Sequence, residues 1–141
     1  MIKESNINII TEVICPVAVQ RAIKISAQTA VTKLKLQEIE LNIIVTTQTA
    51  LRRLNKTYRQ KDKSTDVLSF LYDQPPVGEI YLSLAQARVQ AKKYELSLVS
   101  EVSKLVIHGL VHLAGYDHET DKQWRTMKVW EERILKDLPR L

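Results

Sequence analysis

The chain has 141 residues, of which 45% are hydrophobic and 26% are charged, and these proportions are typical of one globular domain. A domain of this length buries roughly two-thirds of the surface that its unfolded chain exposes, so it forms a core without disulfide bonds. The one cysteine, Cys15, excludes an intramolecular disulfide framework and fits a reducing compartment. No apolar run reaches the ~18 residues of a membrane span, and residues 1–10 lack the apolar block of a signal peptide. We therefore expect a cytoplasmic protein without a membrane partner.

The charged residues leave a net charge of +5, from 21 Lys and Arg against 16 Asp and Glu. Such a balance permits attraction to a polyanion but does not require it. Six basic residues gather within twelve positions, with one acid among them: Arg52, Arg53, Lys56, Arg59, Lys61 and Lys63. By itself this basic run is more typical of a solvated helix face and loop than of a binding site.

The first half of the chain carries the patterns of two strands and two helices. Alternation predicts a strand over residues 7–14, and Pro16 suits the start of a helix that continues to Leu34. Residues 38–46 alternate strictly and form the clearest strand of the sequence. Thr47 is a candidate cap for a short helix that ends at Tyr58.

The second half predicts a hairpin followed by three helices. Residues 66–72 and 77–82 read as strands on either side of the Pro75-Pro76 break. Ser83 caps a helix to about residue 94, and further helices are expected over residues 97–114 and 120–138. Early strands, late helices and helices between them indicate an α+β or α/β layer fold.

All three histidines, His108, His112 and His118, lie within eleven residues. On a helix, positions i and i+4 share one face, so the first two can offer imidazole nitrogens to one ion at ~2.0–2.1 Å. Gly115 lies where the end of a helix often requires a positive φ, and the turn after it would bring His118 back as a third ligand. Three imidazoles without cysteine favour Zn²⁺ with one position open to water over a closed structural site.

The spacing H-x3-H-x5-H equals that of the metzincin peptidases except at one position, where Gly109 replaces the general-base glutamate. Glycine can neither take a proton from water nor deliver one to a leaving amine, so ordinary peptidase activity is disfavoured. A glycine inside a helix costs about 1 kcal/mol relative to alanine. We expect Gly109 to mark a close backbone approach or space beside the metal, with a merely tolerated helix glycine as the alternative.

Several stretches of the sequence resemble motifs of the YbeY family of bacterial endoribonucleases. HGLVHLAGYDHE at residues 108–119 is similar to the family's H-G-x-L-H-L-x-G-Y-D-H. Upstream, LN at 54–55, YR at 58–59 and TDVLSF at 65–70 are similar to the family's L-N-x-x-[YF]-R and T-D-V-L-S-F block, and GEI at 78–80 takes the place of its G-D/E-I strand. The matches follow the family's order along essentially the whole chain. Val111 and Leu71 depart from the usual residues, and neither position is a ligand.

The resemblance implies a single α+β domain over residues 1–141, in which a small mixed sheet of about four strands packs with about five helices. It implies one zinc ion per chain on His108, His112 and His118, held by a late helix and the turn after it. It further implies a single-strand-specific endoribonuclease that acts in 16S rRNA 3′ end maturation and ribosome quality control. The implied partners are single-stranded rRNA and components of the small ribosomal subunit. The resemblance also singles out Arg59 as functionally important.

The mechanism that we expect combines the metal with phosphate binding. Zinc lowers the pKa of a bound water toward ~7, and Arg59 grips the phosphodiester. Arg52 and Lys56 are expected to attract phosphates diffusely. The candidate general bases are Asp117, Glu119, Asp66 and a phosphate oxygen of the substrate, and Asp117 is equally a candidate partner of a ligating histidine. Attack by the 2′-hydroxyl of RNA is an open alternative that would leave a 2′,3′-cyclic phosphate.

The aromatic residues offer contacts for a single strand of RNA. Tyr58, Phe70 and Tyr72 are candidates for stacking on bases, although an aromatic in a strand is more often part of the core. We interpret Trp130 as a packing residue and Trp124 as either a packing residue or a partner contact.

Two other functions fit the same residues. One is a metal-dependent hydrolase of another bond, a peptidase or amidase that uses some other base. The second is a non-catalytic ribosome-assembly factor in which zinc only locks the turn at His118.

Overall fold

The computed structural model describes residues 6–59, 66–73, 76–116 and 119–139. These residues form four strands and five helices: β1 (Asn6–Thr11), α1 (Val17–Lys33), β2 (Glu40–Thr46), α2 (Gln48–Arg59), β3 (Val67–Asp73), β4 (Pro76–Ser83), α3 (Leu84–Lys93), α4 (Leu98–Leu113) and α5 (Asp121–Asp137). The predicted α+β domain, with its four-stranded mixed sheet and five helices, is confirmed.

The sheet has the strand order β1-β2-β4-β3, with β1, β2 and β4 parallel and β3 antiparallel to β4. The predicted hairpin is therefore confirmed, and Asp73 pairs with Pro76 at its tip. Strand β1 ends at Thr11 instead of continuing to residue 14 as predicted. The neighbouring strand β2 ends at Thr46. The Glu12 amide donates to the Val45 carbonyl at 2.8 Å, and the described pairing between β1 and β2 ends there.

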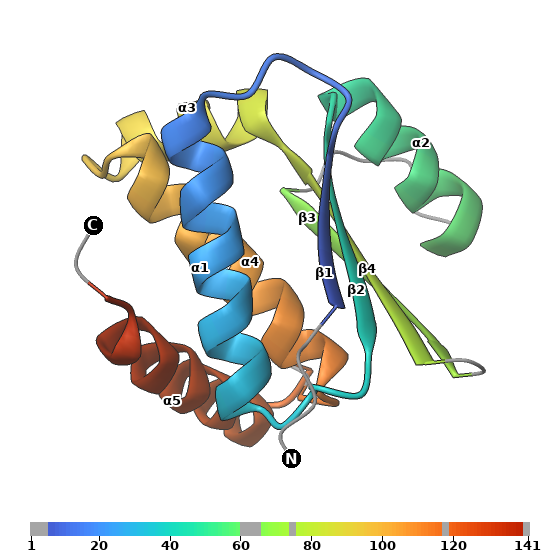
Figure 1. The fold of residues 1–141 in the computed structure, drawn as a ribbon, viewed down its shortest axis with the longest axis vertical. Coiled ribbons are helices and arrows are strands. Elements are labelled where there is room, and N and C mark those ends of the chain that lie inside the picture. The colour runs from blue at the N-terminus through green and yellow to red at the C-terminus, as the bar shows by residue number, and fades with distance from the viewer. Residues whose placement is uncertain (1–5, 60–65, 74–75, 117–118, 140–141) are drawn as a thin grey trace.

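Helices cover both faces of this sheet. Figure 1 shows α1, α4 and α5 on one side of the strands and α2 on the other. Strict alternation in β2 predicts one buried face, yet Ile44 is buried along with Leu41, Ile43 and Val45. On the second face, that of Ile44, Glu40 is exposed and Asn42 half-buried, so burial increases along β2 towards the end that leads into α2.

Helix α4 is the central helix of the fold, because it packs against α1, α3, α5 and the β3–β4 hairpin. Its N-cap is Ser97, whose hydroxyl accepts a hydrogen bond from the Ser100 amide at 3.0 Å. Among the described helices, none is long and apolar enough by itself to cross a membrane. Helices α3 and α4 reach that length only together, and they are bent by 114° where they meet.

Candidate metal centre

Two of the predicted ligands lie one turn apart on α4. His108 and His112 are both partly exposed, while most of their neighbours on this helix are buried. The i, i+4 spacing places the two imidazoles on the face that is not packed into the core. The third predicted ligand, His118, and its neighbour Asp117 lie outside the described residues. Within the described ranges, no group of three His, Cys, Asp or Glu side chains is arranged to hold an ion.

The end of α4 turns the chain back as predicted. The Gly115 amide donates to the His112 carbonyl at 3.0 Å, and the Tyr116 amide donates to the Val111 carbonyl at 3.3 Å. These two bonds form a Schellman motif, which requires a left-handed residue at its turn. Gly115 supplies it with φ of +102°. Tyr116 then packs against Trp130, with their ring centroids 5.5 Å apart.

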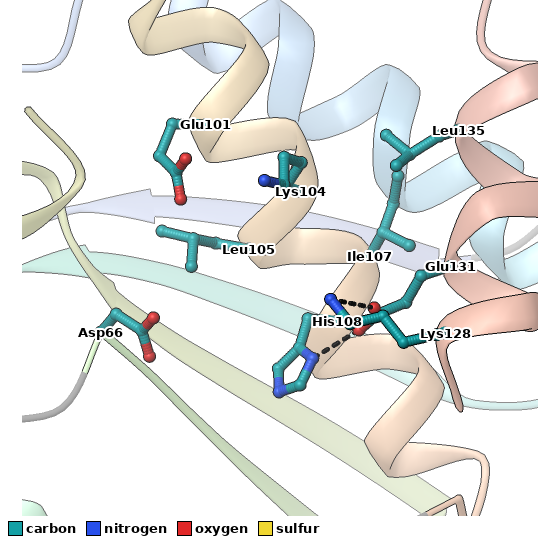
Figure 2. Close-up of a pocket in the computed structure, with 9 residues that line it drawn as sticks. All are labelled: Asp66, Glu101, Lys104, Leu105, Ile107, His108, Lys128, Glu131 and Leu135. Atoms are coloured by element: carbon teal, nitrogen blue, oxygen red, sulfur yellow. Dashed lines mark hydrogen bonds and ion pairs between the residues drawn. The ribbon is translucent and has the colours of Figure 1, made fainter. Parts of the chain in front are cut away.

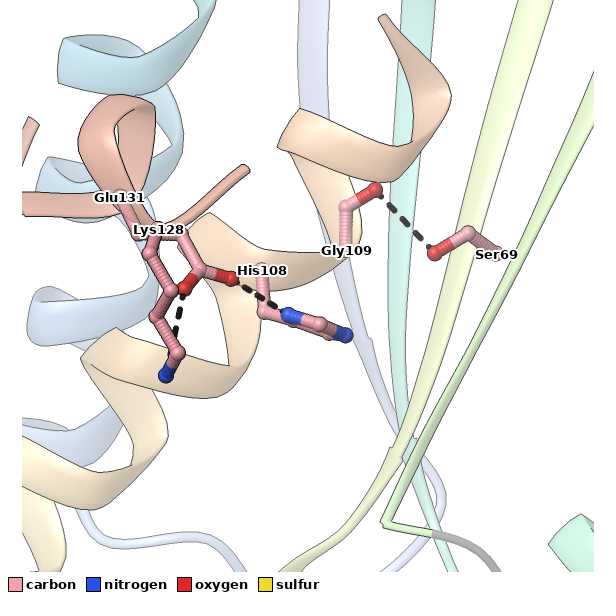
Figure 3. A network of polar contacts seen from close by, with 5 residues as sticks. All are labelled: Ser69, His108, Gly109, Lys128 and Glu131. Carbon is pink, nitrogen blue, oxygen red and sulfur yellow. Dashed lines mark hydrogen bonds and ion pairs between the residues drawn. The ribbon is translucent and has the colours of Figure 1, made fainter. Parts of the chain in front are cut away.

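A carboxylate from α5 holds one nitrogen of His108. The Nδ1 of His108 lies 2.5 Å from Oε1 of Glu131, whose side chain is only 13% exposed. Figure 3 shows the second ring nitrogen pointing away from Glu131. Histidines that ligate metals commonly donate their other nitrogen to a carboxylate in this way, so the arrangement fits a metal ligand that binds through Nε2. Lys128 Nζ lies 3.8 Å from the other carboxylate oxygen of Glu131.

Gly109 faces the sheet. A Cβ at this position would lie 3.2 Å from Ile80 Cδ1 and 3.2 Å from Ser69 Oγ. The Ser69 hydroxyl also donates to the Gly109 carbonyl at 3.2 Å, as Figure 3 shows. The expected close backbone approach is confirmed, and it is an approach to β3 and β4. A side chain at this position would therefore require Ile80 or Ser69 to shift by a few tenths of an ångström.

Two hollows meet at His108. One has a volume of about 170 Å³ and is lined by Asp66 and Glu101 together with residues of α4 and α5 (Figure 2). The second has a volume of about 320 Å³ and lies on the Trp124 side. Trp124 is 51% exposed, and Lys128 Nζ lies 5.4 Å from the centre of its ring. Trp130 packs against the core as predicted, whereas Trp124 is largely open to solvent.

The predicted phosphate-binding residues belong to α2, on the other face of the sheet. Arg52 and Lys56 are exposed there, and neither lines either of the two hollows. Arg59 is the last residue of α2, and its side chain lies outside the described part of the structure. The expected closeness of the Arg59 side chain to the histidines therefore stays a prediction.

The predicted stacking residues form a connected group on the α2 side of the hairpin. Tyr58 and Tyr72 are exposed, and Phe70 is half-buried. The Phe70 ring meets Tyr58 edge to face at 5.5 Å and Tyr81 at 5.9 Å. Burial raises the pKa of Tyr81 to about 12, and the neighbouring Glu79 carboxylate adds to the shift, so Tyr81 keeps its proton at neutral pH.

Three further residues line the smaller hollow at His108, and the sequence motifs did not identify them. Glu131 and Lys128 come from α5, and their approach depends on how that helix packs on α4. Glu101 precedes His108 by seven residues on the same helix, and this spacing is the one signal that could have identified it.

Comparison with known proteins identifies the family. A family model described as Endoribonuclease YbeY matches residues 6–139. The chain is 41% identical over 117 residues to Endoribonuclease YbeY of Myxococcus xanthus, covering 77% of this chain and 40% of that protein. It is 44% identical over 98 residues to Endoribonuclease YbeY of Aquifex aeolicus, covering 66% and 65%. The matched segments thus span less than two thirds of the length of either relative.

A solved structure has a similar fold. The solution structure of TM1509 from Thermotoga maritima is similar with a TM-score of 0.60 and 26% sequence identity, covering 93% of this chain and 90% of that one. The family match spans both motifs of the sequence, the strand hairpin and the α4 turn. On this extent of similarity, the chain belongs to the YbeY family.

Proposed function

We propose that this protein is a zinc-dependent endoribonuclease that cleaves single-stranded RNA in the cytoplasm. The observation that carries the proposal is the His108–His112 pair on α4, with Nδ1 of His108 held by Glu131 beside two hollows. The family match supports RNA as the substrate. The finer role, maturation of the 16S rRNA 3′ end and ribosome quality control with small-subunit components as partners, rests on the family resemblance.

The zinc ligands in this proposal are His108, His112 and His118. When bound, zinc supplies a Lewis acid that lowers the pKa of a water ligand and polarises a phosphate oxygen. Glu131 keeps His108 in the tautomer with its proton on Nδ1, which directs Nε2 to the ion. The turn at Gly115 brings the chain back towards α4 and so supports the assignment of His118 as the third ligand.

Arg59 positions the phosphodiester in this proposal. A guanidinium binds two phosphate oxygens in a fixed geometry and offsets the charge that develops during phosphoryl transfer. Arg52 and Lys56, exposed on the same helix, add sequence-independent attraction to the RNA backbone. The net charge of +5 agrees with a polyanionic substrate.

The proton acceptor is sought among the carboxylates near His108. Asp66 lines the smaller hollow, where its Oδ2 accepts a hydrogen bond from Gln90 Nε2 at 3.2 Å. Glu119 is exposed, and Asp117 lies outside the described residues. Asp66 is therefore the described acid whose place in the hollow shared with His108 supports the role of base. Gly109 offers no carboxylate at the position of the metzincin base, so the peptidase alternative requires another base.

Three variants test the proposal: His112→Ala, Arg59→Glu and, as a control of equal charge change, Arg88→Glu on the exposed side of α3. Zinc content and cleavage of a labelled single-stranded rRNA fragment are measured for each. We expect His112→Ala to lose both zinc and cleavage, and Arg59→Glu to keep zinc while cleaving about 100-fold more slowly. Arg88→Glu should behave as wild type.

Equal trace cleavage by all four proteins would contradict the proposal, because it would identify a contaminating nuclease. Metal-dependent cleavage of a protein substrate that also needs His112 would favour the peptidase alternative. The ends of the RNA products assign the attacking group, since a 2′,3′-cyclic phosphate would show attack by the 2′-hydroxyl and not by water.

A further inference from the structure

The smaller hollow beside His108 lies between α4, α5 and the residue that precedes β3. Its volume is about 170 Å³, whereas one water occupies only ~10–15 Å³ of such space. A cavity of roughly 150 Å³ is large enough to hold benzene, so this hollow has room for one sugar or base ring. Its polar lining consists of Asp66, Glu101, Lys104, His108, Lys128 and Glu131.

Glu101 is the buried acid of this hollow. Only 4% of its surface is exposed, and no donor in the described chain reaches its Oε2. Figure 2 shows its carboxylate and the His108 ring on the same side of α4, with Asp66 on the facing strand end. A buried carboxylate oxygen without a donor is less favourable than an apolar side chain of similar size. An acid kept at a cost to stability beside a reactive site is typical of a residue retained for function.

The charges around the hollow indicate which ligand would complete it. Glu101 and Asp66 offer acceptor oxygens inside, while Lys104 and Lys128 are exposed ammonium groups at its edge. A ligand that matches both has neutral hydrogen-bond donors joined to a phosphate, as a nucleotide has. Among the described residues, no three His, Cys, Asp or Glu side chains are arranged to bind a second metal ion here. A ligand that donates hydrogen bonds to the carboxylates therefore fits the hollow better than an ion does.

We propose that this hollow is a nucleotide subsite in which Glu101 accepts a hydrogen bond from the nucleotide next to the cleaved phosphodiester. Lys104 and Lys128 attract the phosphate of that nucleotide. The inference rests on the proposed function, because His108 places the zinc site at one end of the hollow. The donor is a ribose hydroxyl or a base amino group, since carboxylates in proteins accept hydrogen bonds from both.

The experiment uses the zinc-loaded full chain with Glu101→Gln, Glu101→Leu and the control Glu132→Gln, an exposed acid on α5. Four quantities are measured: KM and kcat for a labelled single-stranded RNA, its Kd by fluorescence anisotropy, the melting temperature, and the zinc content. The two Glu101 variants should raise KM and Kd at least tenfold, to roughly the extent expected for a lost charge-assisted hydrogen bond, with kcat nearly unchanged. Their melting temperatures should equal or exceed that of wild type, because each replaces a buried carboxylate that has an oxygen without a donor.

The outcomes separate this inference from the proposed function. If wild type and both Glu101 variants bind RNA equally well, the subsite is wrong even where cleavage is normal. A fall in melting temperature together with loss of zinc would show that Glu101 only supports the fold, and would also overturn the subsite. If wild type binds RNA in a Glu101-dependent way but never cleaves it, the subsite holds and the nuclease function fails.

Substituted RNAs then identify the donor. One set carries a single 2′-deoxynucleotide at each position next to the cleavage site, and another carries bases that lack the amino group. The difference in Kd between wild type and Glu101→Gln should disappear for the substrate that lacks the donor. A difference that persists for every substituted RNA would overturn the hydrogen bond to Glu101.

Discussion

The contact between His108 and Glu131 engages Nδ1 of the ring and so assigns Nε2 to the metal in the proposed zinc site. Nδ1 lies 2.5 Å from Oε1 of a carboxylate that is 13% exposed, so water competes little for this hydrogen bond. A proton fixed on Nδ1 leaves the lone pair of the ring on Nε2, and the same bond restrains rotation of the ring. In the proposed zinc site, Glu131 would thus position His108 without being a ligand itself.

Removal of this carboxylate should weaken zinc binding. We expect Glu131→Leu to lower zinc affinity by about 10–100-fold, the usual effect of losing the partner of a ligating histidine. Glu131→Gln should lower the zinc affinity less, because its amide oxygen still accepts a hydrogen bond from Nδ1 of His108. Zinc affinity is measured by competition with a chromophoric chelator, with Glu132→Gln as the matched control. Unchanged affinity in Glu131→Leu would show that the contact does not position His108.

The residues around His108 differ in how far the sequence could predict them. His108 and His112 follow from helical spacing alone, because i and i+4 share a face in any helix. Glu131 is 23 residues from His108 on another helix, and the rotation of that helix depends on tertiary packing. Glu101 has the right spacing, but no pattern distinguishes a buried acid from a solvated one before the packing of α4 is known.

At the scale of elements, the turn after α4 depends on the backbone of one residue. Gly115 has φ of +102°, and among the described residues no atom beyond its two chain neighbours lies within 4 Å of the place where its Cβ would stand. A side chain there would meet open space, so the cost of any substitution comes from the backbone conformation and not from crowding.

Gly115→Ala should therefore lower the free energy of unfolding by about 1–2 kcal/mol. Gly115→Asn is the matched control, because asparagine tolerates a left-handed backbone better than alanine does. Its free energy of unfolding should therefore fall less than that of Gly115→Ala. Zinc affinity should fall in the same order, since His118 follows this turn. Chemical denaturation and chelator competition provide the two measurements, and equal losses in the two variants would contradict the backbone explanation.

Helix starts were more predictable than strand ends. Thr47 and Ser83 each accept a hydrogen bond from a backbone amide three residues later, and Thr120 forms a full capping box with Gln123. These signals are local, so the sequence carries them completely. The end of β1 depends instead on where its neighbour β2 stops, which no pattern within β1 reveals.

At the scale of the whole molecule, the candidate site forms where two consecutive helices meet a segment from the middle of the chain. Helix α4 carries His108 and Glu101, α5 brings Glu131 and Lys128, and the chain before β3 contributes Asp66. The order of strands and helices limited the fold class to α+β or α/β, because few layer arrangements suit that order, and the family resemblance implied α+β. The two hollows could not be predicted from the sequence, because their shape depends on how the side chains of α4 and α5 pack against each other.

In the proposed function, zinc on α4 enables this chain to cleave RNA, so cleavage must follow the zinc content of the protein. Zinc content and cleavage of single-stranded RNA are followed in one preparation as purified, after chelation, and during stepwise return of zinc. We predict about one zinc per chain, loss of cleavage on chelation, and recovery in proportion to the zinc returned, while His112→Ala recovers nothing. Full cleavage by the metal-free protein, or recovery in His112→Ala equal to wild type, would contradict the claim.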